Sequence, residues 1–355
     1  MKCMIACLGL VTLFLSPVLA QTVDLSQGEG DIPSTFPYVT DQFDHVRQEV
    51  MIPMRDGVKL FTVVLIPKNA EEPMPIILMR TPYDVTKYTL RTPSPRMAVT
   101  AGAWAEPLVR KGYVLAFQDV RGKYRSEGKY VLNLPARGPL NSGNVDHDTD
   151  TWDTIDWLAK NVPGNNGRVG ITGCSYDGFL TLMALLDPHP ALKAAVPVNA
   201  MVDCWIGDDW YHNGAFRPVN FDYVYFQTTT KGDERLPPHD QYDFYSAVLE
   251  AGSTGEFGKR YHADLLPAWN RLLENPAYTA YWREQAVDRL LAAVPLRVPI
   301  LHVHSLFDQE DIYGTIATYT ALEAKDVRND MNSLALGPWV HAQMRSEERR
   351  VGKEW

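Results

Sequence analysis

Short apolar runs recur along most of the chain, and segments of helical character separate them. The runs that predict strands lie at residues 58–66, 74–79, 113–118, 169–172, 194–198, 299–304 and 333–336. Between two of them, residues 151–161 space Trp, Ile, Trp and Leu at helical intervals behind acidic positions, which is typical of an amphipathic helix. Strands that alternate with helices predict a mostly parallel sheet covered on both faces, and therefore an α/β fold.

One long segment departs from this alternation of strands and helices. Residues 205–290 are rich in aromatic side chains and loops, then become helical, and contain no clear strand. We interpret them as a cap inserted into an α/β core whose first part is 46–204 and whose second part is 291–344. Residues 21–45 then form an N-terminal arm.

Both ends of the chain differ from this pattern. Residues 1–20 carry one Lys, an apolar run and a Val-Leu-Ala ending, which predicts a signal peptide cut after Ala20 and a secreted or periplasmic bacterial protein. An uncleaved anchor is the alternative, although the run is short for a membrane span. Residues 345–355 are polar without an apolar face. We interpret them as a translated sequencing adapter at the end of a shortened gene, with a solvated charged tail as the alternative.

Composition narrows the class of protein. The 355 residues are 45% hydrophobic and 22% charged, which is typical of a soluble globular protein and excludes disordered, fibrous and multi-span membrane proteins. The net charge of −9 argues against nucleic acid or an anionic membrane surface as partner. Four cysteines are too few for a disulfide framework. After signal cleavage only Cys174 and Cys204 remain, either paired or as buried thiols.

A candidate nucleophile lies between a predicted strand and a predicted helix. Residues 173–178 read Gly-Cys-Ser-Tyr-Asp-Gly, directly after the strand at 169–172 and before the apolar run 179–184. A strict nucleophile elbow has glycine two residues on either side of the serine. Here Asp177 occupies the second of those positions and glycine follows one residue later. The pattern nevertheless favours Ser175 as a nucleophile, with a plain strand-to-helix turn as the alternative.

A serine nucleophile needs a base and an acid, which follow it in this architecture in the order acid, then base. The loop after the strand at 299–304 offers three acids, Asp308, Glu310 and Asp311, of which Asp308 comes first. His341 is the only histidine beyond that loop, so it is the candidate base. His302 and His304 lie within the strand and are expected to be buried supporting residues. Asp146, His147 and Asp148 show no firm metal-ligand pattern, and we interpret them as a loop and a helix start.

Four further motifs precede the elbow in order: MRDG at 54–57, RTPY at 80–83, DVRG at 119–122 and SEG at 126–128. Together they resemble the X-Pro dipeptidyl-peptidase-type α/β hydrolases, the group with cocaine esterase (CocE/NonD) and glutaryl acylases. Over residues 45–344 the chain is most similar to the α-amino-acid ester hydrolases. That resemblance implies an α/β-hydrolase fold with an inserted helical cap. It also implies a C-terminal jelly-roll domain that is absent here, so we expect exposed apolar surface and poor folding.

The resemblance assigns roles to single residues. It implies a triad of Ser175, Asp308 and His341, and an oxyanion hole made by the backbone N–H of Tyr176 and the phenol of Tyr83. It further implies that the substrate's α-ammonium is bound by Asp209, Glu310 and Asp311. Spacing does not decide whether Asp208 or Asp209 faces the site, so Asp209 depends on the resemblance.

The implied reaction is hydrolysis of, and acyl transfer from, α-amino acid esters or amides, with water or β-lactam nuclei as acceptors and no metal or cofactor. Intact relatives assemble as tetramers, and no nucleic acid or membrane partner is implied after signal cleavage. An X-Pro dipeptidyl-peptidase-like enzyme and a general carboxylesterase or acylase of the same fold are the alternatives. A non-catalytic binding protein with the hydrolase fold is a further one, although the complete triad argues against it.

Overall fold

The computed structural model describes residues 31–37, 39–68, 70–90, 94–232, 237 and 242–344. The predicted signal peptide and the predicted artefactual tail lie outside the described residues. The chain divides into two units, residues 1–41 and 42–355. In the first unit the described residues form no helix or strand. Everything that follows concerns the second unit.

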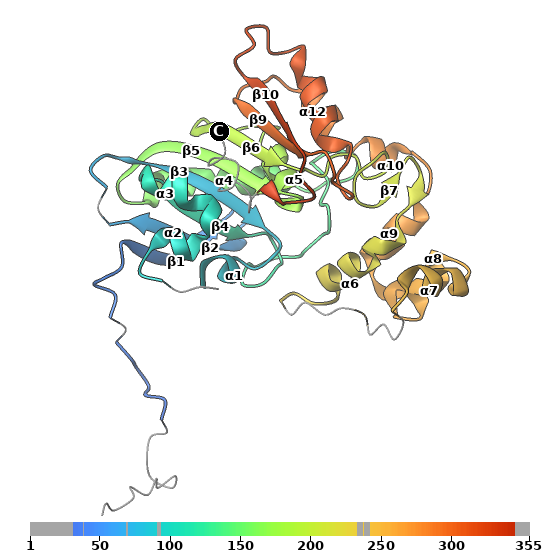
Figure 1. Ribbon diagram of the computed structural model, residues 1–355, viewed down its shortest axis with the longest axis horizontal. Coiled ribbons are helices and arrows are strands. Elements are labelled where there is room, and N and C mark those ends of the chain that lie inside the picture. Colours follow the sequence, from blue (N-terminus) through green and yellow to red (C-terminus); the bar gives the residue numbers. More distant parts are fainter. Residues whose placement is uncertain are drawn as a thin grey trace, which may run out of the picture. The chain divides into compact units, whose positions relative to one another are not determined.

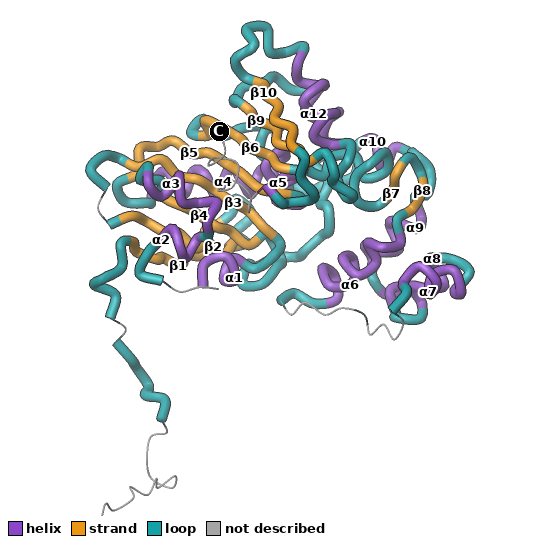
Figure 2. The backbone as a smooth tube through the Cα atoms, viewed as in Figure 1, coloured by secondary structure: helices purple, strands orange, loops and turns teal. Residues whose placement is uncertain are grey.

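A single eight-stranded sheet forms the centre of this unit (Figures 1 and 2). Its strands are β1 (His45–Pro53), β2 (Lys59–Pro67), β3 (Met74–Thr81), β4 (Val114–Asp119), β5 (Asn165–Cys174), β6 (Leu192–Val198), β9 (Ile300–Ser305) and β10 (Asn332–Gly337). Their order across the sheet is β1-β2-β4-β3-β5-β6-β9-β10. The pairs from β4 to β10 are parallel, whereas β1–β2 and β2–β4 are antiparallel.

Both faces of the sheet are covered. Along β2, Phe61, Val63 and Leu65 belong to one apolar cluster, whereas Leu60 and Val64 belong to another, because successive side chains of a strand point to opposite faces. The helices of the core are α1 (Val85–Leu90), α2 (Met97–Ala101), η1 (Ala103–Ala105), α3 (Glu106–Arg110), α4 (His147–Asn161), α5 (Tyr176–Met183) and α12 (Gly314–Glu323). The first four contribute to the smaller cluster, and α4 and α5 contribute to the larger one.

In the segment between β6 and β9, the described residues add no strand to the large sheet (yellow to orange in Figure 1). The segment contains β7 (Tyr211–His212), β8 (Ala215–Phe216), η2 (Pro218–Asn220), α6 (Phe221–Thr229), α7 (Phe244–Ala251), α8 (Thr254–Lys259), η3 (Ala263–Leu265), α9 (Pro267–Glu274), α10 (Ala280–Arg283) and α11 (Val287–Ala293). Buried aromatic rings hold these short elements together: Phe221 contacts both Phe257 and Trp269 at 5.0 Å between ring centroids. The domain boundaries drawn from the sequence stay a prediction.

The predicted α/β fold is confirmed, and each of the seven predicted strands is present within a few residues of its expected bounds. The sequence pattern missed β1, an edge strand whose side chains are mostly exposed or partly exposed. The helix expected at 151–161 begins earlier, at His147, because Asp146 caps it: the Asp146 side chain accepts from Thr149 N and the Thr149 hydroxyl accepts from Asp146 N.

The order of the strands decides where a site can form. From β3 the chain pairs β4 on one side and later β5 on the other, so the order reverses at β3. In open α/β sheets, ligands bind beyond the carboxyl ends of the strands at such a reversal. The segments that follow β3, β5, β9 and β10 carry Tyr83, Ser175, Asp308 and His341.

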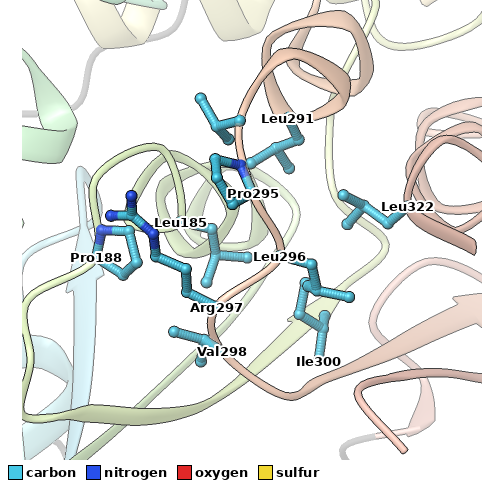
Figure 3. Close-up of a pocket in the computed structure, with 10 residues that line it drawn as sticks. Leu185, Pro188, Leu291, Pro295, Leu296, Arg297, Val298, Ile300 and Leu322 are labelled. Carbon is cyan, nitrogen blue, oxygen red and sulfur yellow. The ribbon is translucent and has the colours of Figure 1, made fainter. Parts of the chain in front are cut away.

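Three further observations complete the description. Among the described residues, no helix is both long and apolar enough to cross a membrane. Cys174 and Cys204 are both buried and form no disulfide with each other. An apolar pocket of about 230 Å³ lies where β9 begins, with none of the predicted site residues in its lining (Figure 3).

Apolar side chains are exposed on β9, β10 and the loops after them, including Leu306, Phe307 and Val340. The expectation of poor folding stays a prediction.

Candidate active site

Ser175 occupies a strained turn between β5 and α5. Its φ and ψ of 64° and −125° are unusual for a residue with a side chain, and its N–H donates to Val198 O of β6 at 2.9 Å. A Cβ on Gly173 would lie 2.3 Å from Asp177 O, and one on Gly178 would lie 2.8 Å from Val198 O. Glycine is therefore required one residue later than in the strict motif, because Gly178 is the position that packs against β6.

The two predicted oxyanion donors lie beyond β5 and β3. Tyr176 is the first residue of α5, so its N–H has no acceptor within the helix. Its phenol is buried and accepts a hydrogen bond from Asn133 N at 3.0 Å. The phenol of Tyr83 lies 2.9 Å from that of Tyr223. Burial, and next the negative charge of Asp177, hold the pKa of Tyr83 well above its usual value, so this phenol keeps its proton at neutral pH.

Asp308 and His341, the predicted acid and base, lie within hydrogen-bonding distance of each other. His341 Nδ1 lies 2.7 Å from Asp308 Oδ2, and Asp308 Oδ1 accepts from the N–H groups of Glu310 and Asp311. Burial opposes the charge of Asp308, but the bond to His341 and these backbone donors hold its pKa below the usual value. The loops that carry the pair are tied together, since Phe307 N donates to Trp339 O at 2.9 Å.

Sequence reasoning missed Asn199, which directly follows β6. This residue is fully buried, and its side-chain amide donates to Asp308 Oδ2 and to Ser305 Oγ while accepting from Ser305 N. Asn199 therefore donates to the same carboxylate oxygen of Asp308 that faces His341 Nδ1. The only signal in the sequence was a polar residue at the carboxyl end of a predicted strand.

His341 faces Glu310 with its second ring nitrogen. His341 Nε2 lies 3.6 Å from Glu310 Oε2. Burial would lower the pKa of His341, but the hydrogen bond and charge of Asp308, together with Glu310 and Asp209, outweigh burial and raise it. Among the described residues there is no hydrogen bond between Ser175 and His341. Such catalytic bonds often form only when substrate is bound.

The structure separates the roles of the two neighbouring acids on the loop after β6. Asp208 is fully buried, and its carboxylate accepts four backbone N–H groups: those of Val202 and Asp203 on one side, and those of Tyr313 and Gly314 at the start of α12 on the other. Asp208 therefore fixes two loops against each other. Asp209 adopts a positive φ of 49° and donates its N–H to Glu310 O, which brings it to the loop of the acid.

Asp209, Glu310 and Asp311 form an acidic cluster beside the acid–base pair. Burial, followed by the charge of Glu310, raises the pKa of Asp209 above its usual range. Asp311 is fully buried, and neither of its carboxylate oxygens has a hydrogen-bond partner among the described residues. Burial, and then Asp209 and Asp208, raise its pKa strongly. A cation placed among these groups would relieve their repulsion.

The described residues contain no group of three or more His, Cys, Asp or Glu side chains that could hold a metal ion. The chemistry that the arrangement supports is nucleophilic: a partly buried elbow serine, an imidazole held by Asp308, the two predicted oxyanion donors and a set of carboxylates. His302 and His304 are both buried, and His302 Nε2 lies 3.1 Å from Asn332 Oδ1.

Comparison with known proteins adds a family and several relatives. Residues 56–343 match the family model described as X-Pro dipeptidyl-peptidase (S15 family). The chain is 29% identical over 323 residues to cocaine esterase from Rhodococcus sp. (strain MB1 Bresler), covering 86% of this chain and 51% of that protein.

Among solved structures, an α-amino acid ester hydrolase is 49% identical with a TM-score of 0.86, over 93% of this chain and 52% of that one. An aminopeptidase from a marine sediment archaeon, Thaumarchaeota archaeon, is 47% identical with a TM-score of 0.87, over 90% and 52%. A CocE/NonD family hydrolase from Staphylococcus aureus is 16% identical with a TM-score of 0.55, over 90% and 54%, and shows the shared fold. The chain thus spans about half the length of these relatives.

Proposed function

The chain belongs to the X-Pro dipeptidyl-peptidase (S15) family, and from that membership we propose that it is a serine hydrolase acting on esters of α-amino acids. The observation that carries the proposal is the acidic cluster of Asp209, Glu310 and Asp311 beside the Asp308–His341 pair. In the described part of the chain, no Lys or Arg side chain forms a salt bridge with any of these three carboxylates. Arg217 is the nearby cation: its guanidinium donates to Asp209 O, and its charge lowers the pKa of Asp209 without outweighing burial and Glu310. The cluster is therefore available to a cation that comes with the substrate.

In the first half of the reaction, Ser175 Oγ attacks the ester carbonyl carbon while His341 takes the hydroxyl proton. Asp308 keeps the imidazole oriented and stabilises its positive charge. The N–H of Tyr176 and the phenol of Tyr83 donate to the oxyanion that develops on the carbonyl oxygen. The C–O bond to the alcohol then breaks, and His341 returns its proton to the leaving alkoxide. An acyl-enzyme remains on Ser175.

In the second half, a water molecule gives a proton to His341 and attacks the acyl carbon. The bond from that carbon to Ser175 Oγ then breaks as His341 returns the proton to Oγ, which releases the amino acid and restores Ser175. An amine can attack in place of water and then yields an amide. We further propose that β-lactam nuclei serve as acyl acceptors, which would extend the activity to synthesis or hydrolysis of β-lactam antibiotics.

The α-ammonium determines the substrate class. Near three carboxylates in a partly dehydrated site, the ammonium is stabilised electrostatically far more than it would be in water. A substrate without the ammonium leaves those carboxylates repelling one another, so the cluster acts against such substrates as well as for amino esters. An anionic glutaryl side chain would meet the same repulsion, which argues against a glutaryl acylase.

A second candidate is hydrolysis of peptides from their N-terminus. The structure that is 47% identical to this chain is an aminopeptidase, and a peptide also presents an α-ammonium next to the scissile acyl group. The same residues would act, with an amine in place of an alcohol as the leaving group. An enzyme of the X-Pro dipeptidyl-peptidase kind is the related alternative.

The deciding experiment compares phenylglycine methyl ester with its des-amino analogue, phenylacetic methyl ester, with Ser175→Ala as the blank. We expect kcat/KM for the amino ester to be higher by about 10- to 100-fold, as for loss of a charged hydrogen bond from a buried partner. Equal rates on both esters would reduce the proposal to a general serine esterase.

Two further measurements separate the rivals. Labelling of Ser175 by a fluorophosphonate distinguishes an enzyme from a binding protein, since a folded sample that is not labelled favours the latter. Phenylglycine p-nitroanilide, an amide with the same acyl group, tests the aminopeptidase candidate: amide hydrolysis as fast as ester hydrolysis would favour it.

A further inference from the structure

The cap helix α6 reaches the candidate active site through one side chain. Tyr223 lies near the start of α6, and its hydroxyl is 2.9 Å from that of Tyr83. The two rings meet edge to face with centroids 6.5 Å apart, and Trp210 lies against Tyr223 at 5.9 Å. Both phenols are partly buried. A residue of the inserted segment is thus hydrogen-bonded to the phenol that would bind the oxyanion.

Contacts at both ends hold α6 in this position. At its carboxyl end, the buried ammonium of Lys123 donates to Gln227 O at 3.0 Å and to Thr230 O at 3.4 Å. The phenol of Tyr130 donates to the side chain of Gln227 at 3.2 Å. A buried cation that binds the last carbonyls of a helix stabilises that helix end strongly.

At the amino end, the side chain of Asn220 donates to Asp209 O. The same helix therefore contacts the acidic cluster, the core and Tyr83. Because these contacts fix both ends of α6, they also fix the position of the Tyr223 hydroxyl relative to Tyr83.

We propose that Tyr223 is a positioning residue that donates its hydroxyl proton to Tyr83 and so directs the Tyr83 proton to the oxyanion. The inference rests on the proposed function, because it takes Tyr83 as an oxyanion donor. A phenol has one proton, so Tyr83 can donate to the substrate only if Tyr223 is the donor in the bond between them. A donated bond also polarises the Tyr83 hydroxyl and strengthens the bond that it gives.

The experiment is a double-mutant cycle on the wild-type chain, Tyr83→Phe, Tyr223→Phe and the double variant, with phenylglycine methyl ester as substrate. Tyr83→Phe is expected to lower kcat by about 100-fold or more, as for other oxyanion donors. Tyr223→Phe is expected to lower kcat by about 3- to 10-fold with KM nearly unchanged, since it removes one hydrogen bond and keeps the ring. The double variant should equal Tyr83→Phe, because Tyr223 acts only through Tyr83.

Tyr225→Phe is the matched control, because Tyr225 lies two residues further along α6, is also partly buried, and contacts Phe221. It should leave kcat and KM as in wild type. Losses that multiply in the double variant, or a Tyr223→Phe that behaves like Tyr225→Phe, would overturn the inference.

The outcomes separate this inference from the proposed function. A non-additive cycle with equal rates on amino and des-amino esters would refute the substrate class and leave the role of Tyr223 intact. An additive cycle with the amino preference retained would refute Tyr223 alone. A folded wild type that hydrolyses neither ester would refute both.

Discussion

Two clusters of charged side chains, each with members at or near the carboxyl ends of strands, differ in how their positive and negative charges are paired. The first joins Arg80, Arg121, Asp56 and Asp150. The second joins Asp209, Glu310 and Asp311 next to Asp308 and His341. Burying an ion is costly unless it is paired and hydrogen-bonded, so the pairing within each cluster indicates what that cluster is for.

The first cluster is balanced. Arg121 forks between Asp150 and Asp56, with its shortest contacts at 2.6 Å and 2.7 Å, and Arg80 lies 3.7 Å from Asp150. Arg80 also donates to Gln118, to His147 O and to Thr151. Two guanidinium groups meet two carboxylates, so no charge is left over for a ligand. This cluster fixes the loop after β4 against α4.

The second cluster is not balanced. Asp308 is matched to His341, and the remaining three carboxylates form no salt bridge with a Lys or Arg side chain in the described part of the chain. The charge of Arg217 acts on Asp209, but one cation faces three carboxylates. The lesson is that sign and balance, more than burial, separate a structural cluster from a binding site. The balanced cluster should govern stability, and the unbalanced one should govern substrate choice and pH dependence.

The largest expected effect is on the balanced cluster. Arg121→Met leaves two carboxylates without their bidentate partner, one of them fully buried, and should lower the free energy of unfolding by about 3–5 kcal/mol. Urea denaturation measures the loss. Arg55→Met is the control: Arg55 pairs with Asp153 at 2.8 Å at a partly exposed position, so its removal should cost about 0–1 kcal/mol. Equal losses in the two variants would contradict the comparison.

The next effect separates two neighbours on one loop. Asp208→Asn places an amide donor against backbone donors and should lower the free energy of unfolding by about 1–3 kcal/mol. Asp209→Asn removes like-charge repulsion, so it should leave stability unchanged or slightly raised while reducing the preference for the amino ester about 10-fold or more. Denaturation and the ratio of kcat/KM for the two esters measure both effects. If Asp209→Asn lowered stability and left the preference for the amino ester intact, Asp209 would be the structural residue and its assignment to substrate binding would be wrong.

The smallest effect is a displacement of the pH profile. His341 must be neutral to accept a proton, so kcat/KM should rise with pH through the raised pKa of His341. The charge of Glu310 stabilises the imidazolium, so Glu310→Gln should lower this pKa and move the acidic limb of the profile to lower pH. Glu256→Gln, on exposed α8 where Glu256 pairs with Lys259, should leave the limb in place. If the acidic limb stayed in place or moved to higher pH in Glu310→Gln, the result would argue against an interaction between Glu310 and His341.

Most of the fold could be predicted from the sequence because buried parallel strands are continuous apolar runs. The seven runs all became strands, and the elbow serine followed from its place between one of them and an apolar helix. The edge strand β1 was missed because its side chains are mostly exposed or partly exposed and give a weaker hydrophobic signal. The short helices between β6 and β9 were not resolved individually, since aromatic contacts between residues far apart in sequence hold them.

The site divides in the same way. Chain order and residue type sufficed to nominate Ser175, Asp308 and His341, because the architecture fixes which strand end each group follows. Nothing local distinguished Asp208 from Asp209, and nothing local marked Asn199 or Tyr223. Their roles depend on partners about 100 or more residues away, such as the N–H groups of Tyr313 and Gly314 for Asp208.

By itself, therefore, the sequence determined which elements form and which chemical groups stand at the ends of its strands. Periodicity and motif are local properties that backbone and side chain impose within a few residues. Only the tertiary structure decided which carboxylate is saturated by backbone donors and which is left without a salt bridge, and which residue between β6 and β9 meets the phenol of Tyr83. Hydrogen bonding and charge balance are properties of what surrounds a group in space, and the loops after β3, β6 and β9 meet only when the sheet has formed.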